Sequence, residues 1–174
     1  MLFAYDGSEL AKHAIAEAGQ LLSESALDAV VLTIWRPYDV GFVPPGGFNF
    51  DAKQPADVRR AAEETAAHGA ALARAAGFQA ASRAVEGAPT WKAIADTADE
   101  GDARLIVLGS PGRHGLAGRL AGSVAGAVSA HSARSVLVVH RAVRSRTDEE
   151  KELRPRALEL IEPLSDLRPT PDES

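Results

Sequence analysis

The stretch of residues 104–129 constrains the fold most, because it joins a short apolar run, a group of glycines and a helical pattern. Residues 105–108 are too few for a helix and stop at Gly109, which predicts a fully buried strand. A stripe of apolar residues four apart then predicts a helix: Leu116, Leu120, Val124 and Val128. In the order strand, glycine-rich loop and helix, backbone N–H groups and the positive end of a helix dipole meet at the carboxyl edge of a sheet. An anion can bind there.

The rest of the chain repeats the alternation of strand and helix. We expect short apolar strands at residues 2–5, 29–35, 105–108 and 136–139, and a weaker strand at 78–85 that alternates only loosely. We expect helices near residues 9–23, 58–76 and 89–100, and a fourth that ends near residue 131. In the first of these helices Leu10, Ala14, Ala18 and Leu21 form the apolar stripe. This alternation predicts an α/β fold with a parallel sheet, helices on both faces, and a ligand outside the carboxyl ends of the strands.

Two segments depart from this rhythm. Residues 36–56 are rich in proline and phenylalanine and are predicted to form a long loop, of a kind that is often a functional lid. Residues 141–174 are predicted to be a polar C-terminal extension beyond a domain of residues 1–140. A short amphipathic helix is possible there, although Pro155 and Pro163 interrupt its apolar stripe. That helix would pack on the domain or, alternatively, on a partner subunit.

Composition excludes several classes of function. The net charge of −5 argues against nucleic acid and anionic membranes as partners, because both favour a basic surface. The chain has no cysteine, so disulfides, thiolate metal sites and cysteine nucleophiles are excluded. No apolar run approaches the length of a membrane span, and we expect a cytoplasmic protein.

The glycine spacing is specific. Two residues separate Gly109 from Gly112, and nine separate Gly112 from Gly122 and Ser123; the sequence GSPGRHGL starts this loop, and SVLVVH stands at 135–140. This pattern resembles the nucleotide-binding members of the universal stress protein family over residues 2–140. The resemblance implies a five-stranded Rossmann-like sheet of order 3-2-1-4-5 and binding of ATP, with Mg²⁺. It also implies a homodimer formed through the last strand.

The resemblance places the phosphates on the glycine loop and on the start of the fourth helix. Gly109, Gly112 and Gly122 would let the backbone approach the ligand, and the alternative is ordinary packing glycine. Backbone N–H groups around Ser123 would hold the terminal phosphates, and the site continues through Val124 and Ala125. Family members commonly carry Ser or Thr where this chain has Ala125, so one hydroxyl contact is missing.

Four other residues complete the candidate site. Arg113 and His114 could contact phosphates from the loop, or could be solvated loop residues. Asp6 matches the family's acidic residue beside the nucleotide, where it could support a divalent cation, and it also suits an Asx turn in the sequence Asp-Gly-Ser. Ile34 matches the position whose backbone meets the adenine, and would otherwise be a core residue.

Three functions remain open at this stage. The first is a regulatory ATP-binding protein of the stress response. The second is a slow ATPase, against which stand the missing Walker sequence and the lack of a nucleophile–base pair supported by spacing. The third is a dimerisation module without nucleotide. We predict no catalytic residue, and His13, His68, His131 and His140 show no metal-binding spacing.

Overall fold

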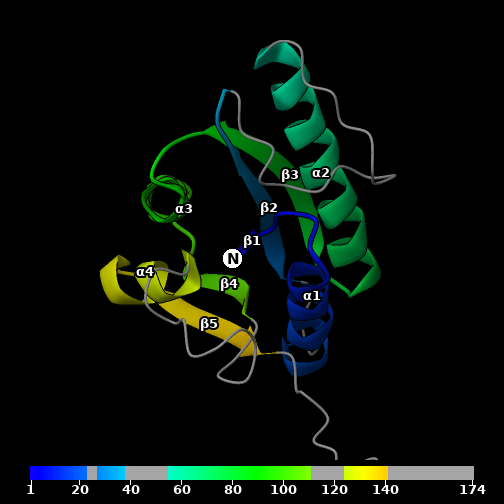
Figure 1. Cartoon of the computed structure of the whole chain (residues 1–174). Helices are drawn as coiled ribbons and strands as arrows, with labels where there is room; N and C mark the ends of the chain where they lie inside the picture. Colours follow the sequence, from blue (N-terminus) through cyan, green and yellow to red (C-terminus); the bar gives the residue numbers. More distant parts are fainter. Residues whose placement is uncertain (23–26, 38–54, 111–123, 141–174) are drawn as a thin grey trace, which may run out of the picture. The chain divides into compact units, whose positions relative to one another are not determined.

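A computed structural model describes residues 1–22, 27–37, 55–110 and 124–140 of the chain (Figure 1). The chain divides into two units, Met1–Arg141 and Ala142–Ser174, and every described residue belongs to the first. Residues 38–54 of the loop predicted at 36–56, most of the glycine loop and the C-terminal extension lie outside the described residues.

The sheet has five parallel strands in the order β3-β2-β1-β4-β5. These strands are β1 (Leu2–Ala4), β2 (Asp28–Trp35), β3 (Gln79–Glu86), β4 (Leu105–Ser110) and β5 (Ser135–His140). β1 lies at the centre, where Phe3 is in register with Val31 of β2 and with Val107 of β4. The α/β class, the parallel sheet and the strand order predicted from the sequence are confirmed.

Two helices cover each face of the sheet (Figure 1). α1 (Glu9–Leu22) and α2 (Pro55–Ala75) lie on one face, and α3 (Thr90–Glu100) and α4 (Val124–His131) lie on the other. Each helix follows a strand through a crossover, as a parallel sheet requires. The chain goes from β1 to β2 and β3 on one side, then returns across β1 to β4 and β5, so the strand order reverses between β1 and β4.

Each face has its own apolar core. On the side of α1 and α2, Phe3 meets the ring of Phe78 edge-on, with centroids 5.1 Å apart, and Ile15 packs in the same cluster. On the side of α3 and α4, the buried cluster includes Leu32, Ile94, Ile106, Leu108 and Val128. Because successive strand residues point to opposite faces, the continuous apolar strands supply both cores.

The structure corrects several expected boundaries. α2 begins at Pro55, inside the predicted loop of residues 36–56, because proline suits the first turn of a helix, where its missing N–H is not needed. β4 continues through Gly109 to Ser110 instead of stopping at Gly109, because both residues pair with β5. Helix α2 ends close to Gly77, as predicted, and Gly77 has a positive φ of 98°.

Two apolar residues predicted on buried helix stripes are exposed. Leu21 is 66% exposed in the last turn of α1, and Val124 is 40% exposed at the start of α4. Apolar spacing identifies one side of a helix, but it does not show whether neighbouring elements cover the first and last turns. In β5 only Val139 is fully buried, while Val136, Leu137 and Val138 are half-buried, because β5 is an edge strand.

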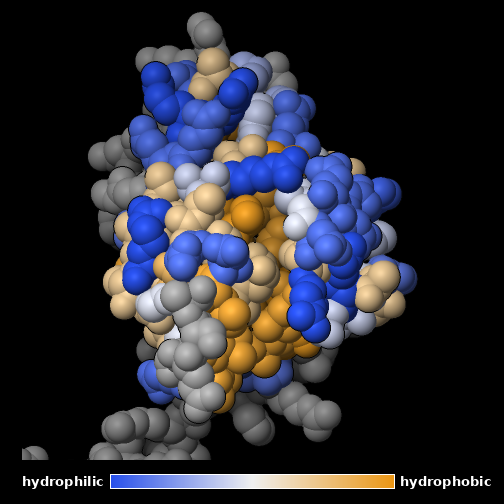
Figure 2. Space-filling model, turned by 180° about the vertical axis from the view of Figure 1, so that it is seen from behind, coloured by the Kyte–Doolittle hydropathy of each residue, from blue (hydrophilic) through white to orange (hydrophobic). Residues whose placement is uncertain are grey.

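The surface retains open apolar area. Figure 2 shows the face opposite to the view of Figure 1, where apolar residues gather in the centre and lower part and hydrophilic residues surround them. Single exposed apolar residues are normal on a soluble domain, whereas a gathered patch is typical of a surface that meets another molecule.

We predict that replacements at two positions of α1 separate the buried stripe from its exposed end. Ile15→Ala removes a side chain that is 2% exposed and should lower the free energy of unfolding by about 2–5 kcal/mol, because a cavity remains in the core. Leu21→Ala, in the same helix, should change it by less than about 0.5 kcal/mol. Urea unfolding of both variants measures this, and equal losses would contradict the described burial of α1.

Candidate functional site

A crevice of about 320 Å³ opens at the carboxyl ends of β1, β2 and β4. It lies where the strand order reverses, which is the place where open α/β sheets bind ligands. The three strands supply Ala4, Leu32, Ile34, Leu108 and Gly109 to its lining, and Tyr5 follows directly after β1. The first turns of α1, α3 and α4 supply residues as well, so three helices start at this crevice.

The structure brings together every predicted site residue that it describes. Asp6, Ile34, Gly109, Val124 and Ala125 all line this crevice, although they come from four separate points: the turn after β1, and the elements β2, β4 and α4. The remaining five predicted residues lie outside the described part of the chain: Gly112, Arg113, His114, Gly122 and Ser123. The roles of all ten in binding a ligand stay predictions.

The turn after β1 fixes the position of Asp6. Gly7 has a positive φ of 82°, which favours glycine, and the N–H of Ser8 donates to Asp6 Oδ1 at 3.0 Å. The hydroxyl of Ser8 accepts from the N–H of Ala11 at 3.2 Å, so Ser8 caps α1 as its sequence position predicts. The Asx turn and a ligand-facing role of Asp6 are compatible, since the exposed Asp6 borders the crevice while it holds the turn.

Gly109 is required by the close approach of α1 to β4. A Cβ at this position would overlap the carbonyl group of Leu10 and press on the N–H of Ala11, all of which are backbone atoms. Any side chain would therefore push the start of α1 away from the sheet. Because Leu10 and Ala11 themselves line the crevice, this glycine sets the width of the crevice between β4 and α1.

One wall of the crevice is apolar. Leu32 and Ile34 come from β2, Leu108 comes from β4, and Ile94 faces them from α3. Leu32, Ile94 and Leu108 are at most 3% exposed, so the wall is part of the core on that side of the sheet. An apolar wall beside polar turn residues and helix starts suits a ligand with a flat apolar part and an anionic part.

Arg36 and Thr90 are among the lining residues that the sequence pattern does not single out. Arg36 follows Ile34 by two positions in the line of β2, so the alternation of a strand places both on the same side of the sheet. Thr90 lies in the first turn of α3, directly after Pro89. Both could have been found by following each predicted strand or helix to the end that faces the carboxyl edge.

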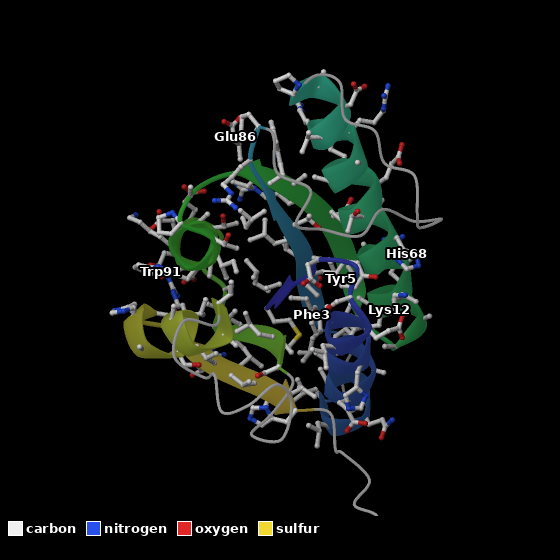
Figure 3. The ribbon with its side chains drawn as sticks, in the orientation of Figure 1. Phe3, Tyr5, Lys12, His68, Glu86 and Trp91 are labelled. Carbon is white, nitrogen blue, oxygen red and sulfur yellow. The ribbon has the colours of Figure 1, made fainter. Side chains whose placement is uncertain are left out.

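Tyr5 connects the floor of the crevice to α2. Its carbonyl oxygen accepts from the hydroxyl of Thr33 at 2.9 Å, and its phenol oxygen lies 2.9 Å from Nδ1 of His68 (Figure 3). Gly69 leaves room for the tyrosine ring, because a Cβ there would lie 2.6 Å from Tyr5 Cδ1. Burial raises the pKa of the phenol to about 12, and the negative charges of Asp6 and Glu9 add to the effect.

Two of the described histidines make side-chain contacts within the fold. His68 pairs with Tyr5, and the ring of His131 lies 4.8 Å from that of Trp91, centroid to centroid. Within residues 1–22, 27–37, 55–110 and 124–140, no group of three or more His, Cys, Asp or Glu side chains could hold a metal ion. In the same residues, no helix is long and apolar enough to cross a membrane.

A doubly wound parallel sheet with a crevice at its reversal point defines an α/β protein of the Rossmann-like class. The model of the universal stress protein family matches residues 1–140. The chain therefore belongs to the universal stress protein family, as its glycine spacing indicates.

Individual relatives agree with this assignment. A universal stress protein of Mycolicibacterium smegmatis is 31% identical over 145 residues, covering 80% of this chain and 45% of the relative, so the chain spans about half of that relative's length. A crystal structure of a universal stress protein in complex with cAMP is 30% identical and has a TM-score of 0.60, covering 81% of this chain and 96% of that one. A family protein from Burkholderia pseudomallei is 25% identical with a TM-score of 0.58, covering 80% and 94% of the two chains.

We predict that Tyr5 makes the fold sensitive to alkaline pH. Its pKa in the folded protein, about 12, lies above the ordinary value of 10, so between these values the unfolded chain binds fewer protons. The stabilising effect is present below pH 10 and is lost as the pH rises towards 12. Melting temperatures measured from pH 8 to pH 11 should fall more steeply for the parent than for Tyr5→Phe, and parallel curves would contradict this account.

Proposed function

We propose that this protein is a regulatory nucleotide-binding module of the stress response that binds ATP in the crevice at the carboxyl ends of β1, β2 and β4. The observation that carries the proposal is the convergence of Asp6, Ile34, Gly109, Val124 and Ala125 on one crevice. The family resemblance selected these residues, which come from four separate parts of the chain. A chance group of loop and core residues would have no reason to share one cavity.

The crevice offers a matching environment for each part of a nucleotide. The apolar wall around Ile34 suits a purine ring, which the backbone of β2 can recognise through hydrogen bonds. The start of α4 at Val124 and Ala125 presents backbone N–H groups and a positive dipole end to phosphates. In this proposal Gly112, Gly122 and Ser123 provide further backbone contacts, and Arg113 and His114 contribute positive donors.

The relative solved with cAMP supports an adenine nucleotide as the ligand class, because it shares the fold at 30% identity. The choice of ATP over another adenine nucleotide is based on the glycine spacing, which is typical of the ATP-binding members of the family. The Ala125 position lacks the hydroxyl common there, so we expect the phosphates to depend mainly on backbone groups.

Mg²⁺ fits the site through Asp6. One carboxylate oxygen accepts from the N–H of Ser8, and a carboxylate has a second oxygen that can face a cation at the crevice. Magnesium commonly uses one or two carboxylates together with phosphate oxygens, so Asp6 with a nucleotide is sufficient. The ion would neutralise part of the phosphate charge.

Binding, not hydrolysis, is the function proposed. The described lining of the crevice contains one carboxylate, from Asp6, and one guanidinium, from Arg36, and we assign no catalytic residue among them. Phosphoryl transfer needs a positioned nucleophile as well as charge neutralisation. We therefore expect nucleotide occupancy to change conformation or partner choice in the cytoplasm.

The family domain is proposed to cover residues 1–140, the span that the family model matches, and residues 141–174 to form an extension. We further propose a homodimer through β5. This strand is at the edge of the sheet, and Val136, Leu137 and Val138 stay half-buried there. An open parallel edge with apolar residues favours pairing with a second chain.

Equilibrium binding of ATP with Mg²⁺ tests the ligand. The nucleotide-free parent should bind, and Gly122→Val should lose at least about 10-fold in affinity, because a branched side chain would occupy the path of the phosphates. Gly101→Ala is the matched control: Gly101 is at the C-cap of α3 with φ −90°, and a Cβ there meets only an ordinary contact at 3.4 Å from the Thr97 carbonyl oxygen.

Two results would contradict this proposal. The first is a nucleotide-free parent that binds no adenine nucleotide, which would leave a dimerisation module as the better account. The second is a folded Gly122→Val variant that binds ATP as well as the parent does. Turnover measured on the same samples separates a sensor from an ATPase.

Sedimentation equilibrium tests the dimer. The parent should show twice the chain mass of 18.2 kDa, and Val138→Lys should shift the mass towards a single chain, because a charge at the half-buried edge opposes pairing. A parent that sediments as a single chain at all concentrations would exclude this assembly.

A further inference from the structure

β3 and β5 form the two outer edges of the sheet, and β3 is paired with β2 along its whole length (Figure 1). Of the described helices, α2 alone packs extensively on β3, because α3 packs on the neighbouring strand β2. Ala81 and Arg83 belong to the face of β3 on the side of α3, and both are exposed. The described chain therefore leaves one face of this edge strand open.

The backbone groups of β3 point alternately to β2 and to the outer edge. The N–H of Gln79 donates to the carbonyl oxygen of Leu27 at 2.9 Å, and Gly87 continues the same pattern at the other end, so odd-numbered residues bond to β2. Even-numbered residues therefore turn their N–H and C=O groups outward. In agreement with this, Arg74 Nη1 donates to the carbonyl oxygen of Ala80 at 2.7 Å and covers the start of the edge.

Beyond Ala80 the edge offers unpaired backbone groups. The outward N–H and C=O groups of Ser82 and Ala84 make no hydrogen bond to another residue in the described part of the chain. A row of such groups is a template on which an extended peptide can add a further strand to the sheet. The second half of β3 thus has the backbone chemistry of a strand-pairing site.

A hollow of about 340 Å³ lies beside this edge, between β3 and α3. Arg83, Val85 and Glu86 line it from β3, and one side of α3 lines it opposite. Gly87 closes one end of the hollow, because a Cβ there would lie 2.5 Å from the Cβ of Ala93. The hollow shares no lining residue with the crevice. A strand added about 4.8 Å from β3 would place every second side chain over it.

The charges around the hollow favour a basic side chain. Arg83 Nη2 lies 3.1 Å from Glu100 Oε2, and Lys92 Nζ lies 2.6 Å from Asp96 Oδ2, so both cations of the lining are paired. The third carboxylate, Glu86, is exposed where β3 ends and forms no ion pair with another described residue (Figure 3). Three carboxylates against two cations give this lining a net charge of −1.

We propose that the edge of β3 binds an extended peptide segment of a partner protein, which pairs with β3 as a sixth strand and places a lysine or arginine side chain in the hollow beside Glu86. The outward backbone groups of Ser82 and Ala84 hold the segment, and the hollow selects its side chain. This surface is separate from the crevice and is at the opposite edge from β5, so it depends neither on the proposed ligand nor on the proposed dimer.

Amide hydrogen exchange of the protein alone tests whether the edge is open. After correction for intrinsic rates, the amides of Ser82 and Ala84 should exchange at least about 10-fold faster than those of Ala81 and Arg83, which bond to β2. Equal protection of the two sets would show that the chain itself covers this edge, and would overturn the proposal.

Binding is measured by NMR with capped hexapeptides of sequence TVTXTV, in which X is lysine, alanine or glutamate. The lysine peptide should shift the amides of Ser82, Ala84 and Glu86 in a saturable manner. It should bind about 5- to 10-fold more tightly than the glutamate peptide, with the alanine peptide between them, because one charge contact at an exposed site changes sign. N-methylation of one alternate set of peptide amides should abolish binding, and N-methylation of the other set should not.

Two pairs of variants separate the backbone from the charge. Ser82→Pro removes an outward N–H at a position where an edge strand tolerates proline, and should weaken the lysine peptide at least about 10-fold, whereas Ser82→Ala keeps the N–H and should bind within about 2-fold. Glu86→Gln should bring the lysine and alanine peptides within about 2-fold of each other. Its control, Glu64→Gln, changes an exposed carboxylate of α2 outside the hollow and should preserve the lysine preference.

Four results would contradict the assignment. The first is a parent protein that does not bind the lysine peptide. The second is a folded Ser82→Pro variant that binds this peptide as well as the parent does. The third is a lysine preference that survives Glu86→Gln. The fourth is a shift of the Ser82 and Ala84 amides with the concentration of the protein alone, which would assign the edge to a second copy of this chain.

Discussion

The rest of the structure depends on the pairing of β1 with strands on both sides. This strand has only three residues, yet it is in register with β2 through Val30–Leu32 and with β4 through Ile106 and Val107. Because the chain leaves β1 in one direction and later returns to pair with its other edge, the helices fall on opposite faces. A crevice forms at the reversal, with three helix starts around it.

Small residues keep that crevice in shape. Gly109 allows the backbone of α1 to touch β4, and Gly69 makes room for the ring of Tyr5 against α2. Tyr5 then ties the end of β1 to its surroundings through Thr33 and His68. The shape of the crevice therefore depends more on close contacts of the backbone than on charged side chains. For this reason the spacing of glycines in the sequence predicts the site.

The sequence predicts most of the fold because apolar strands and amphipathic helices alternate in it so regularly. Strand order came from the family resemblance, since spacing alone cannot choose which strand pairs with β1. The predictions were wrong at the ends of two elements. Leu21 continues the apolar spacing of α1 but is exposed. Gly109 resembles a residue that ends a strand, but it remains in β4 because it pairs with β5. The spacing of apolar residues shows which side of a helix or strand is apolar, but it does not show how far the neighbouring elements cover that side.

The sequence predicts those residues of the candidate site that belong to a motif. It does not predict the residues that reach the crevice only through the folding of the chain. Asp6 and Gly109 stand in recognisable turns and spacings, and both line the crevice. Arg36 and Thr90 carry no motif, and only their places at the end of β2 and the start of α3 bring them to the crevice.

The most direct test of the central claim is a map of amide chemical shifts by NMR while AMP is added to the nucleotide-free protein. If the crevice is the site, the amides of Asp6, Ile34, Gly109 and Ala125 should shift together with one affinity, while those in the middle of α2 should stay in place. Saturable shifts confined to other parts of the chain would contradict the account, as would the absence of any shift.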